Sequence, residues 1–303
     1  MSGLSTVTVR APAKVNLQLS VGARRRDGYH DLATVYQAVS LCDDVTALPG
    51  DGLTMSVEGE GADIVPVDDS NLAMRAARAL ADFAGLEPKA HLHVHKSIPV
   101  AGGMAGGSAD AAAALVALDH LWELGLDRHE LSTIAATVGS DVPFSLMGHT
   151  AIGLGRGEQL TPALARGRFE WVFALASGGL STPEVYAELD RLRDGGVQVE
   201  PRVSESLMAA LLAGDSQALG HAVSNDLQRA AVSLRPQLAM TLDVGDEYGA
   251  LASTVSGSGP TVAFLARDEE HALDLAVALS SSGVCRTVRR ATGPVPGAKV
   301  VEP

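Results

Sequence analysis

Four of the six residues at 102–107 are glycines, and this glycine segment could bind a phosphate group. Glycine lets backbone N–H groups approach a phosphate closely, and the alanine-rich stretch at 109–124 predicts a helix whose positive end would face the same anion. A flexible loop in which Ser108 simply caps the helix fits the composition equally well. Two familiar phosphate motifs are excluded, because no lysine follows the glycines and Met104 stands where G-x-G-x-x-G needs its second glycine.

Lys14 shares a predicted strand face with two side chains that can hydrogen-bond. Residues 7–21 alternate between apolar and polar, so Lys14, Asn16 and Gln18 lie opposite the valines and leucines. A cation beside two amides can line a cleft, although this pattern more often belongs to a solvated surface lysine. Asp141, within Gly-Ser-Asp-Val-Pro, fits either a general base or the N-cap of a helix.

Two further elements have both a functional and a plain structural interpretation. Tyr29 offers a stacking face and His30 a hydrogen-bonding ring for a nucleobase, but the pair also fits a half-buried strand start. The Gly-Ser-Gly-Pro turn at 257–260 could bring N–H groups to a phosphate or merely close a hairpin.

Basic and imidazole side chains form two other clusters. His91, His93 and His95 share a strand parity, but no carboxylate or cysteine follows at ligand spacing, so a solvated face is favoured and no protein-held metal site is predicted. The arginines at 24–26 either attract an anionic substrate or form a solvated turn, and the sequence does not decide between these.

Composition excludes several classes of protein. The 303 residues predict about two domains. A net charge of −13 and 4% aromatic residues disfavour nonspecific binding of nucleic acid or an anionic membrane. Two cysteines exclude a disulfide scaffold and a cysteine-rich zinc module. Neither a signal peptide nor an apolar run of about 18 residues is apparent, so a cytoplasmic chain is expected.

Strands and helices follow one another without strict β-α-β alternation, which predicts an α+β fold rather than a doubly wound sheet. Strands are predicted at 7–21, 29–41, 91–95, 171–176, 254–256, 261–266 and 285–290, and a hairpin at 45–57. Helices are predicted at 71–84, 109–124, 128–138, 183–194, 205–212, 217–221 and 269–280. Pro12 predicts a bulge or an edge, 139–143 a loop, and the tail at 292–303 a frayed end.

Three segments resemble the GHMP kinase superfamily and occur in its order: Pro-Ala-Lys-Val-Asn-Leu at 12–17, the glycine segment at 99–113, and Ser-Gly-Ser-Gly-Pro-Thr at 256–261. Arg-Arg-Asp-Gly-Tyr-His-Asp-Leu at 25–32 and Gly-Ser-Asp-Val-Pro at 139–143 resemble the branch that phosphorylates 4-diphosphocytidyl-2-C-methyl-D-erythritol in the non-mevalonate (MEP) isoprenoid route. The resemblance, over roughly 9–266, implies a ribosomal protein S5 domain 2-like N-terminal domain at 1–167. It further implies a ferredoxin-like C-terminal domain at 168–303 and an active-site cleft between the two.

The resemblance also implies roles for residues. ATP would be the phosphoryl donor, accompanied by Mg²⁺, and the acceptor would be the 2-hydroxyl. Asp141 would be the general base, with Lys14 in support. The implied ATP-binding residues are Pro99, Val100, Ala101, Gly102, Gly103, Met104, Ala105, Gly106, Gly107, Ser108 and Ala109, with Asn71 and Lys96 bordering the adenine. The implied substrate-binding residues are Asn16, Tyr29, His30, Tyr36, Tyr186, Gly257, Ser258 and Gly259, of which the tyrosines and His30 would frame the cytosine.

One position departs from the family pattern. Ala109 stands where the family commonly has a second serine, so one hydroxyl is missing.

Alternatives within and outside the superfamily remain open at this point. A kinase for homoserine, mevalonate or a sugar would have no reason to need Gly28-Tyr29-His30. A noncatalytic nucleotide-binding regulator is disfavoured by the presence of both Lys14 and Asp141. A structural protein has least support, because the sequence shows no internal repeat.

Overall fold

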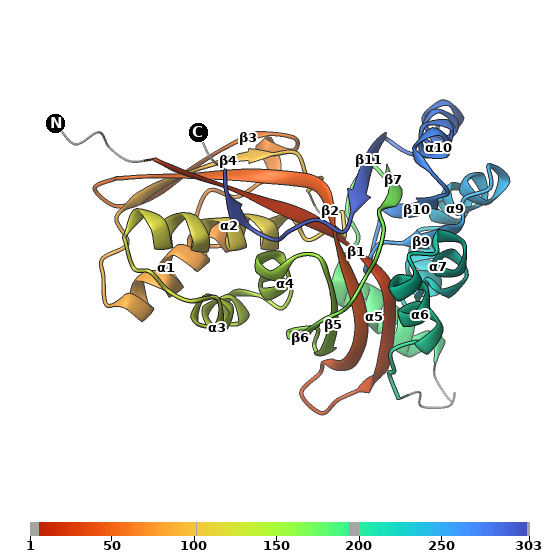
Figure 1. The fold of residues 1–303 in the computed structure, drawn as a ribbon, viewed down its shortest axis with the longest axis horizontal. Helices are drawn as coiled ribbons and strands as arrows, with labels where there is room; N and C mark the ends of the chain where they lie inside the picture. Colours follow the sequence, from red (N-terminus) through yellow and green to blue (C-terminus); the bar gives the residue numbers. More distant parts are fainter. Residues whose placement is uncertain (1–5, 101, 194–199, 302–303) are drawn as a thin grey trace.

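Two β-sheets, each covered by helices, make up the protein in a computed structural model that describes residues 6–100, 102–193 and 200–301 (Figure 1). The first sheet contains β1 (Val7–Arg24), β2 (His30–Leu48), β3 (Leu53–Gly59), β4 (Ala90–Lys96), β5 (Thr150–Gly155), β6 (Gln159–Pro162), β8 (Ser224–Asn225) and β12 (Lys299–Val300). The second contains β7 (Phe169–Leu175), β9 (Ala252–Val255), β10 (Val262–Ala266) and β11 (Thr287–Gly293).

The helices follow the predicted ranges closely, with several additions. They are α1 (Leu72–Ala84), α2 (Gly106–Leu121), α3 (Arg128–Val138), α4 (Val142–Met147), α5 (Thr182–Leu192), α6 (Glu205–Ala213), α7 (Ser216–Ala222), α8 (Gln228–Leu234), α9 (Gln237–Glu247), α10 (Glu269–Ser282) and the 3₁₀ turn η1 (Ala62–Ile64). Of these, α4, α8, α9 and η1 were not expected from the sequence. Within the described ranges no helix combines the length and apolarity needed to cross a bilayer.

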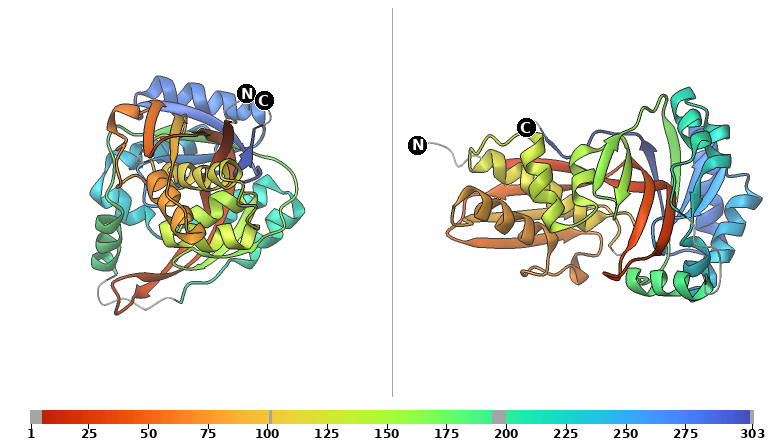
Figure 2. Two further views of the ribbon diagram at one scale, coloured as in Figure 1. Left: turned by 90° about the vertical axis from the view of Figure 1, so that its left-hand side faces the viewer. Right: turned by 90° about the horizontal axis from the view of Figure 1, so that it is seen from below.

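The longest strands, β1 and β2, form the backbone of the first sheet and run antiparallel for nearly their whole length. The pairing register shifts between Pro12 and Ala13, which confirms the bulge predicted at Pro12. Both faces of β1 are buried from Ala11 to Leu19, because α1 to α4 cover one face and the second half of the chain meets the other (Figures 1 and 2). Lys14 therefore lies on the polar face, as predicted, but in a buried position.

The second sheet has the strand order β11-β7-β10-β9, which is 4-1-3-2 in chain order and entirely antiparallel. This is the ferredoxin-like arrangement that was expected. Alternate residues of β7 enter two different cores: Trp171 and Phe173 pack toward the first sheet, whereas Val172 and Ala174 pack against α5, α8, α9 and α10. The second sheet thus lies between its own helices and the N-terminal half, which fixes the two halves against each other.

Two predictions about the first sheet were wrong. β2 and β3 do not form a hairpin across 45–57, because β4 lies between them and pairs antiparallel with β2 and parallel with β3. The tail is not frayed through 301: β12 pairs with β1 at Val9 and Arg10, and the His149 N–H donates to the Val295 carbonyl. The final described residues therefore return to the first sheet, although the proposed domain division assigns them to 168–303.

Candidate active site

A cavity of about 500 Å³ lies where the two halves of the chain meet. Its walls come from β1, β2, the glycine segment, the start of α4, the start of α5 and the β9–β10 turn. The lining includes Lys14, Asn16, Tyr36, Asn71, Lys96, Pro99, Val100, Gly102, Gly103, Ala105, Gly106, Gly107, Asp141, Tyr186, Gly257 and Ser258. Ala101 lies outside the described residues. The fold therefore brings most of the expected nucleotide-binding and catalytic residues into one space.

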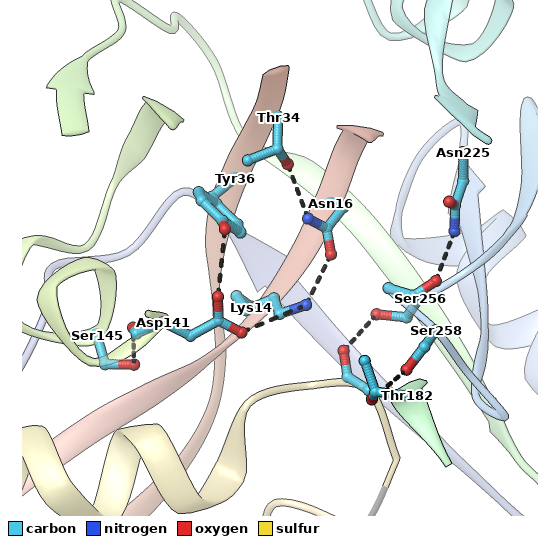
Figure 3. Close-up of polar contacts among 12 residues, drawn as sticks. Lys14, Asn16, Thr34, Tyr36, Asp141, Ser145, Thr182, Asn225, Ser256 and Ser258 are labelled. Carbon is cyan, nitrogen blue, oxygen red and sulfur yellow. Dashed lines mark hydrogen bonds and ion pairs between the residues drawn. The ribbon is translucent and has the colours of Figure 1, made fainter. Parts of the chain in front are cut away.

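A chain of hydrogen bonds holds Lys14 in place on β1 (Figure 3). The Lys14 Nζ donates to Asn16 Oδ1 at 2.7 Å, Asn16 Nδ2 donates to Thr34 Oγ1 at 2.8 Å, and Thr34 Oγ1 donates to the Gln18 carbonyl at 2.7 Å. Burial lowers the pKa of Lys14, and the nearby Asp141 carboxylate raises it in part. The ammonium is thus positioned by its own strand and its neighbour rather than by a strong ion pair.

Asp141 comes from the start of α4, far from Lys14 in the sequence, yet its Oδ2 lies 4.0 Å from Lys14 Nζ. Asp141 occupies the N-cap position of α4 but makes no side-chain capping bond. Instead its Oδ1 accepts a hydrogen bond from the Tyr36 hydroxyl at 3.2 Å (Figure 3). The N-cap interpretation of this residue is therefore incomplete, because its side chain faces the cavity.

Tyr36 contacts Asp141 through its hydroxyl group. Its ring stacks on Phe144 with centroids 4.8 Å apart, and its side chain is buried. Burial, with a contribution from the Asp141 carboxylate, raises the pKa of Tyr36 well above its usual value, so the phenol is a neutral donor. Tyr36 lines the first cavity beside Asp141, and its expected place around the cytosine stays a prediction.

The glycine segment supplies a loop and the first turn of α2. The helix begins at Gly106, earlier than predicted, and its N-cap is Ala105 in the left-handed conformation at φ 60°. Ser108 is inside the first turn, so it is not the cap. The side chains of Met104 and Ala109 are fully buried in the core and do not line the cavity, nor does Ser108. The exposed backbone at the start of α2 therefore provides the N–H groups that face the cavity.

We expect Gly103→Ala to destabilise the protein and to raise the KM for ATP. Gly103 has a φ of +73°, and an added Cβ would lie 2.2 Å from the Ser256 carbonyl oxygen. The left-handed conformation alone costs an alanine about 1 to 2 kcal/mol, and the clash must also displace the loop. Urea unfolding and ATP titration measure both effects. Gly52→Ala is the matched control, because a Cβ there meets nothing within 4 Å; equal losses in both variants would contradict this account.

Asn71 and Lys96 line the cavity but also serve the fold. Asn71 caps α1 by accepting a hydrogen bond from the Ala73 N–H, and its amide donates to the Pro66 carbonyl. Lys96 Nζ donates to Asp43 at 2.5 Å and to Asp110 at 2.6 Å. Burial lowers the pKa of Lys96, but Asp110 and Asp43 together raise it above its ordinary value. This buried triad was not predicted, since nothing in the local sequence links strand β2 to helix α2.

The β9–β10 turn contributes two of its three expected residues. Gly257 and Ser258 line the cavity, whereas Gly259 does not and lies close to Val255. The Ser258 hydroxyl is 2.8 Å from the Thr182 hydroxyl, which joins this turn to the start of α5 (Figure 3). Asn225 fixes the turn by donating from Nδ2 to the carbonyls of Val255 and Gly257.

A second cavity of about 610 Å³ adjoins the first and contains the other expected aromatic residues. Tyr29 is 54% exposed at its rim, and His30 is buried in its wall. His30 Nε2 lies 2.8 Å from Asp190 Oδ1, and its ring lies 5.0 Å from the ring of Tyr186 with a tilt of 36°. Burial raises the pKa of Tyr186.

Among the cavity side chains that sequence reasoning missed are Ser140, Arg156, Thr182 and Asp190. Only Ser140 stood within a recognised motif, as the neighbour of Asp141. The three histidines at 91–95 share one face of β4, as their parity predicts, and they contact Thr54, Ser56 and Glu58 on β3.

Two family models and several named proteins match this chain. The GHMP kinases N terminal domain model matches residues 71–149, and the GHMP kinases C terminal model matches 207–285. The chain is 56% identical to the 4-diphosphocytidyl-2-C-methyl-D-erythritol kinase of Nocardia farcinica, over 99% of this chain and 97% of that one. It is 58% identical to the same-named kinase of Streptomyces avermitilis, over 98% of this chain and all of that one.

Solved structures show the same relationship. A crystal structure of 4-(cytidine 5'-diphospho)-2C-methyl-D-erythritol kinase matches with a TM-score of 0.77 and 33% identity, over 94% of this chain and 98% of that one. Homoserine kinase from Cytophaga hutchinsonii reaches a TM-score of 0.76 at 18% identity, over 99% of both chains, which indicates a shared fold. From the sequence identity over nearly its whole length, the chain belongs to the 4-diphosphocytidyl-2-C-methyl-D-erythritol kinase family of the GHMP kinases.

Proposed function

We propose that this chain transfers the γ-phosphoryl group of ATP to the 2-hydroxyl of 4-diphosphocytidyl-2-C-methyl-D-erythritol, with Asp141 as general base and Lys14 in support. The observation that carries this proposal is the 4.0 Å separation between Lys14 Nζ and Asp141 Oδ2, in a cavity that the backbone of the glycine segment also lines. Phosphoryl transfer needs positioning and charge stabilisation more than covalent chemistry, and this arrangement offers both.

The two oxygens of Asp141 are suited to different tasks. Oδ1 is occupied by the Tyr36 hydroxyl, which orients the carboxylate. Oδ2 faces Lys14 at a distance too long for a hydrogen bond, so an alcohol oxygen beside the pair can lie within hydrogen-bonding distance of both and give its proton to Oδ2. The buried ammonium then stabilises negative charge that develops on the attacking oxygen and on the transferred group.

The phosphate chain of ATP would lie against the N–H groups at the start of α2. Those amides are unsatisfied within the helix, and the helix dipole favours an anion at this end. Mg²⁺ would enter with the nucleotide, held chiefly by phosphate oxygens and water. Within the described ranges no group of three or more His, Cys, Asp or Glu side chains is placed to hold an ion without such help.

The second cavity suits the nucleoside part of the acceptor. Tyr29 and Tyr186 offer ring faces, and His30 is held by Asp190 so that its other ring nitrogen can meet a base edge. A homoserine, mevalonate or sugar acceptor would leave this cavity unused. Relatives at 56% and 58% identity bear the cytidyl-substrate name, whereas the homoserine kinase shares only the fold at 18%. The proposed partners are thus two small molecules, and the proposed location is the cytoplasm.

A coupled ADP-release assay on the purified chain tests the proposal. We expect ADP release to require 4-diphosphocytidyl-2-C-methyl-D-erythritol and Mg²⁺, and to stay at background with homoserine or mevalonate. Turnover with either of those acceptors and none with the cytidyl compound would overturn the substrate assignment. ATP binding without acceptor-dependent turnover would instead favour a noncatalytic nucleotide-binding protein.

We expect Tyr29→Ala to raise the KM for the cytidyl acceptor about twofold to tenfold, while the KM for ATP stays unchanged. Loss of an aromatic stacking partner costs about 0.5 to 1.5 kcal/mol, which corresponds to this range. Tyr248→Ala is a matched control, because Tyr248 is 56% exposed and lines neither cavity. An unchanged acceptor KM in Tyr29→Ala would remove this ring from substrate binding.

A further inference from the structure

The two cavities meet at a junction that five residues share, namely Leu32, Ser140, Arg156, Thr182 and Tyr186. Arg156 is the one cation among these shared lining residues of the described chain. The other cations of the first cavity have partners already, since Lys14 contacts Asn16 and Asp141 and Lys96 lies between Asp43 and Asp110. A negative group that spans both cavities would therefore meet Arg156.

The turn that carries Arg156 is anchored to the reacting centre. It joins β5 to β6, and Gly157 in this turn has a φ of +102°. A Cβ on Gly157 would lie 2.3 Å from the Tyr36 hydroxyl oxygen, so the backbone of the turn rests directly against that phenol. The same hydroxyl donates to Asp141. The position of Arg156 is thus set relative to the carboxylate that would accept the alcohol proton.

The guanidinium also faces the second cavity. The Arg156 Cζ lies 5.0 Å from the centroid of the Tyr29 ring, which is a cation–π distance. The Arg156 side chain is exposed, so it can contact a bound ligand from the rim of the cavity. Arg156 therefore contacts the ring expected to stack on the base and also lines the cavity that contains the carboxylate expected to activate the alcohol.

We infer that Arg156 binds the diphosphate that links the cytidine of the acceptor to its methylerythritol part. This inference rests on the proposed function. With the base in the second cavity and the alcohol at Asp141, the linking diphosphate must cross the junction and bring negative charge to it. A planar guanidinium can donate two parallel N–H bonds to phosphate oxygens, and the hydroxyls of Ser140 and Thr182 line the same junction.

This role is tested by comparing Arg156→Gln with the wild type. The inhibition constants of CDP, CMP and cytidine are measured in both proteins, with the full acceptor as the competing substrate. If Arg156 binds phosphate, the substitution raises the inhibition constants of CDP and CMP by about tenfold or more, because a charge-assisted hydrogen bond contributes more than a neutral one. The inhibition constant of cytidine stays within about twofold of the wild-type value. Arg156→Lys, which keeps the charge and loses the planar donor pair, should recover part of the loss. The KM for ATP should not change.

Other outcomes decide against the inference in distinguishable ways. An equal rise in the inhibition constants of CDP, CMP and cytidine would mean that Arg156 only supports the Tyr29 ring. Unchanged inhibition constants would exclude any contact between Arg156 and these compounds. If the wild-type chain does not turn over the full acceptor, the proposed function itself fails. If it does and none of the three compounds inhibits it, the inference about Arg156 is overturned while the proposed function stands. Arg10→Gln is the matched control, because Arg10 pairs with Asp44 and lines neither cavity.

Discussion

Replacing Asp141 with Asn should lower kcat at least about 10²-fold while the protein stays folded. An amide has the shape of the carboxylate but cannot accept the proton of the attacking alcohol, and loss of such a group typically costs 10²-fold to 10⁴-fold. Stability should change by less than about 1 kcal/mol, because the side chain caps no helix and accepts one long hydrogen bond, from Tyr36.

Steady-state kinetics and urea unfolding of the same preparation separate these effects. Asp31→Asn is the control: Asp31 is an exposed carboxylate that pairs with Arg25 and lines neither cavity. Its turnover should equal that of the wild type. If Asp141→Asn retains near-normal turnover, the carboxylate does not serve as the base and the mechanism must be reassigned.

Replacing Lys14 with Met should also lower kcat at least about 10²-fold, since a preorganised donor at the developing charge is lost. A methionine side chain has a volume similar to that of lysine. Asp141 stays partly solvated, because 28% of the Asp141 side chain is exposed. Stability should therefore change little, because the lost bond to Asn16 is offset by release of a buried charge. Lys89→Met, on a lysine 58% exposed and paired with Glu87, is the control for turnover.

The stability difference between wild type and Lys14→Met should depend on pH with a defined sign. The pKa of Lys14 is lowered by burial in the folded chain, so the unfolded chain holds this proton to higher pH. Below the lowered folded pKa, the ammonium is charged in both states and the full burial cost is present. As pH rises from the lowered folded pKa toward the ordinary value of 10.5, wild type should gain stability relative to the variant. A difference that stays flat or falls across this window would contradict the buried ammonium.

Features governed by neighbouring residues could be predicted from the sequence. Period-two alternation in 7–21 was sufficient for the faces of β1, and Asn71 and Gly85 mark the ends of α1 as caps. The glycine segment and the helix after it were identified for the same reason, because backbone freedom and helix propensity act within a few residues. The resemblance of short motifs then placed Lys14 and Asp141 in one site, and the structure puts them 4.0 Å apart.

Pairings between distant segments required the tertiary structure. The insertion of β4 between β2 and β3, and the return of β12 to β1, depend on which arrangement buries both sheets at once, and no local pattern encodes that. The same holds for side chains whose role comes from a remote partner: Tyr36 reaches Asp141, Asp190 reaches His30, and Arg156 comes to the junction of two cavities. Sequence alone determined the local backbone and the types of reactive group, whereas packing of the two halves decided which groups meet, because only the folded chain brings remote residues within contact distance.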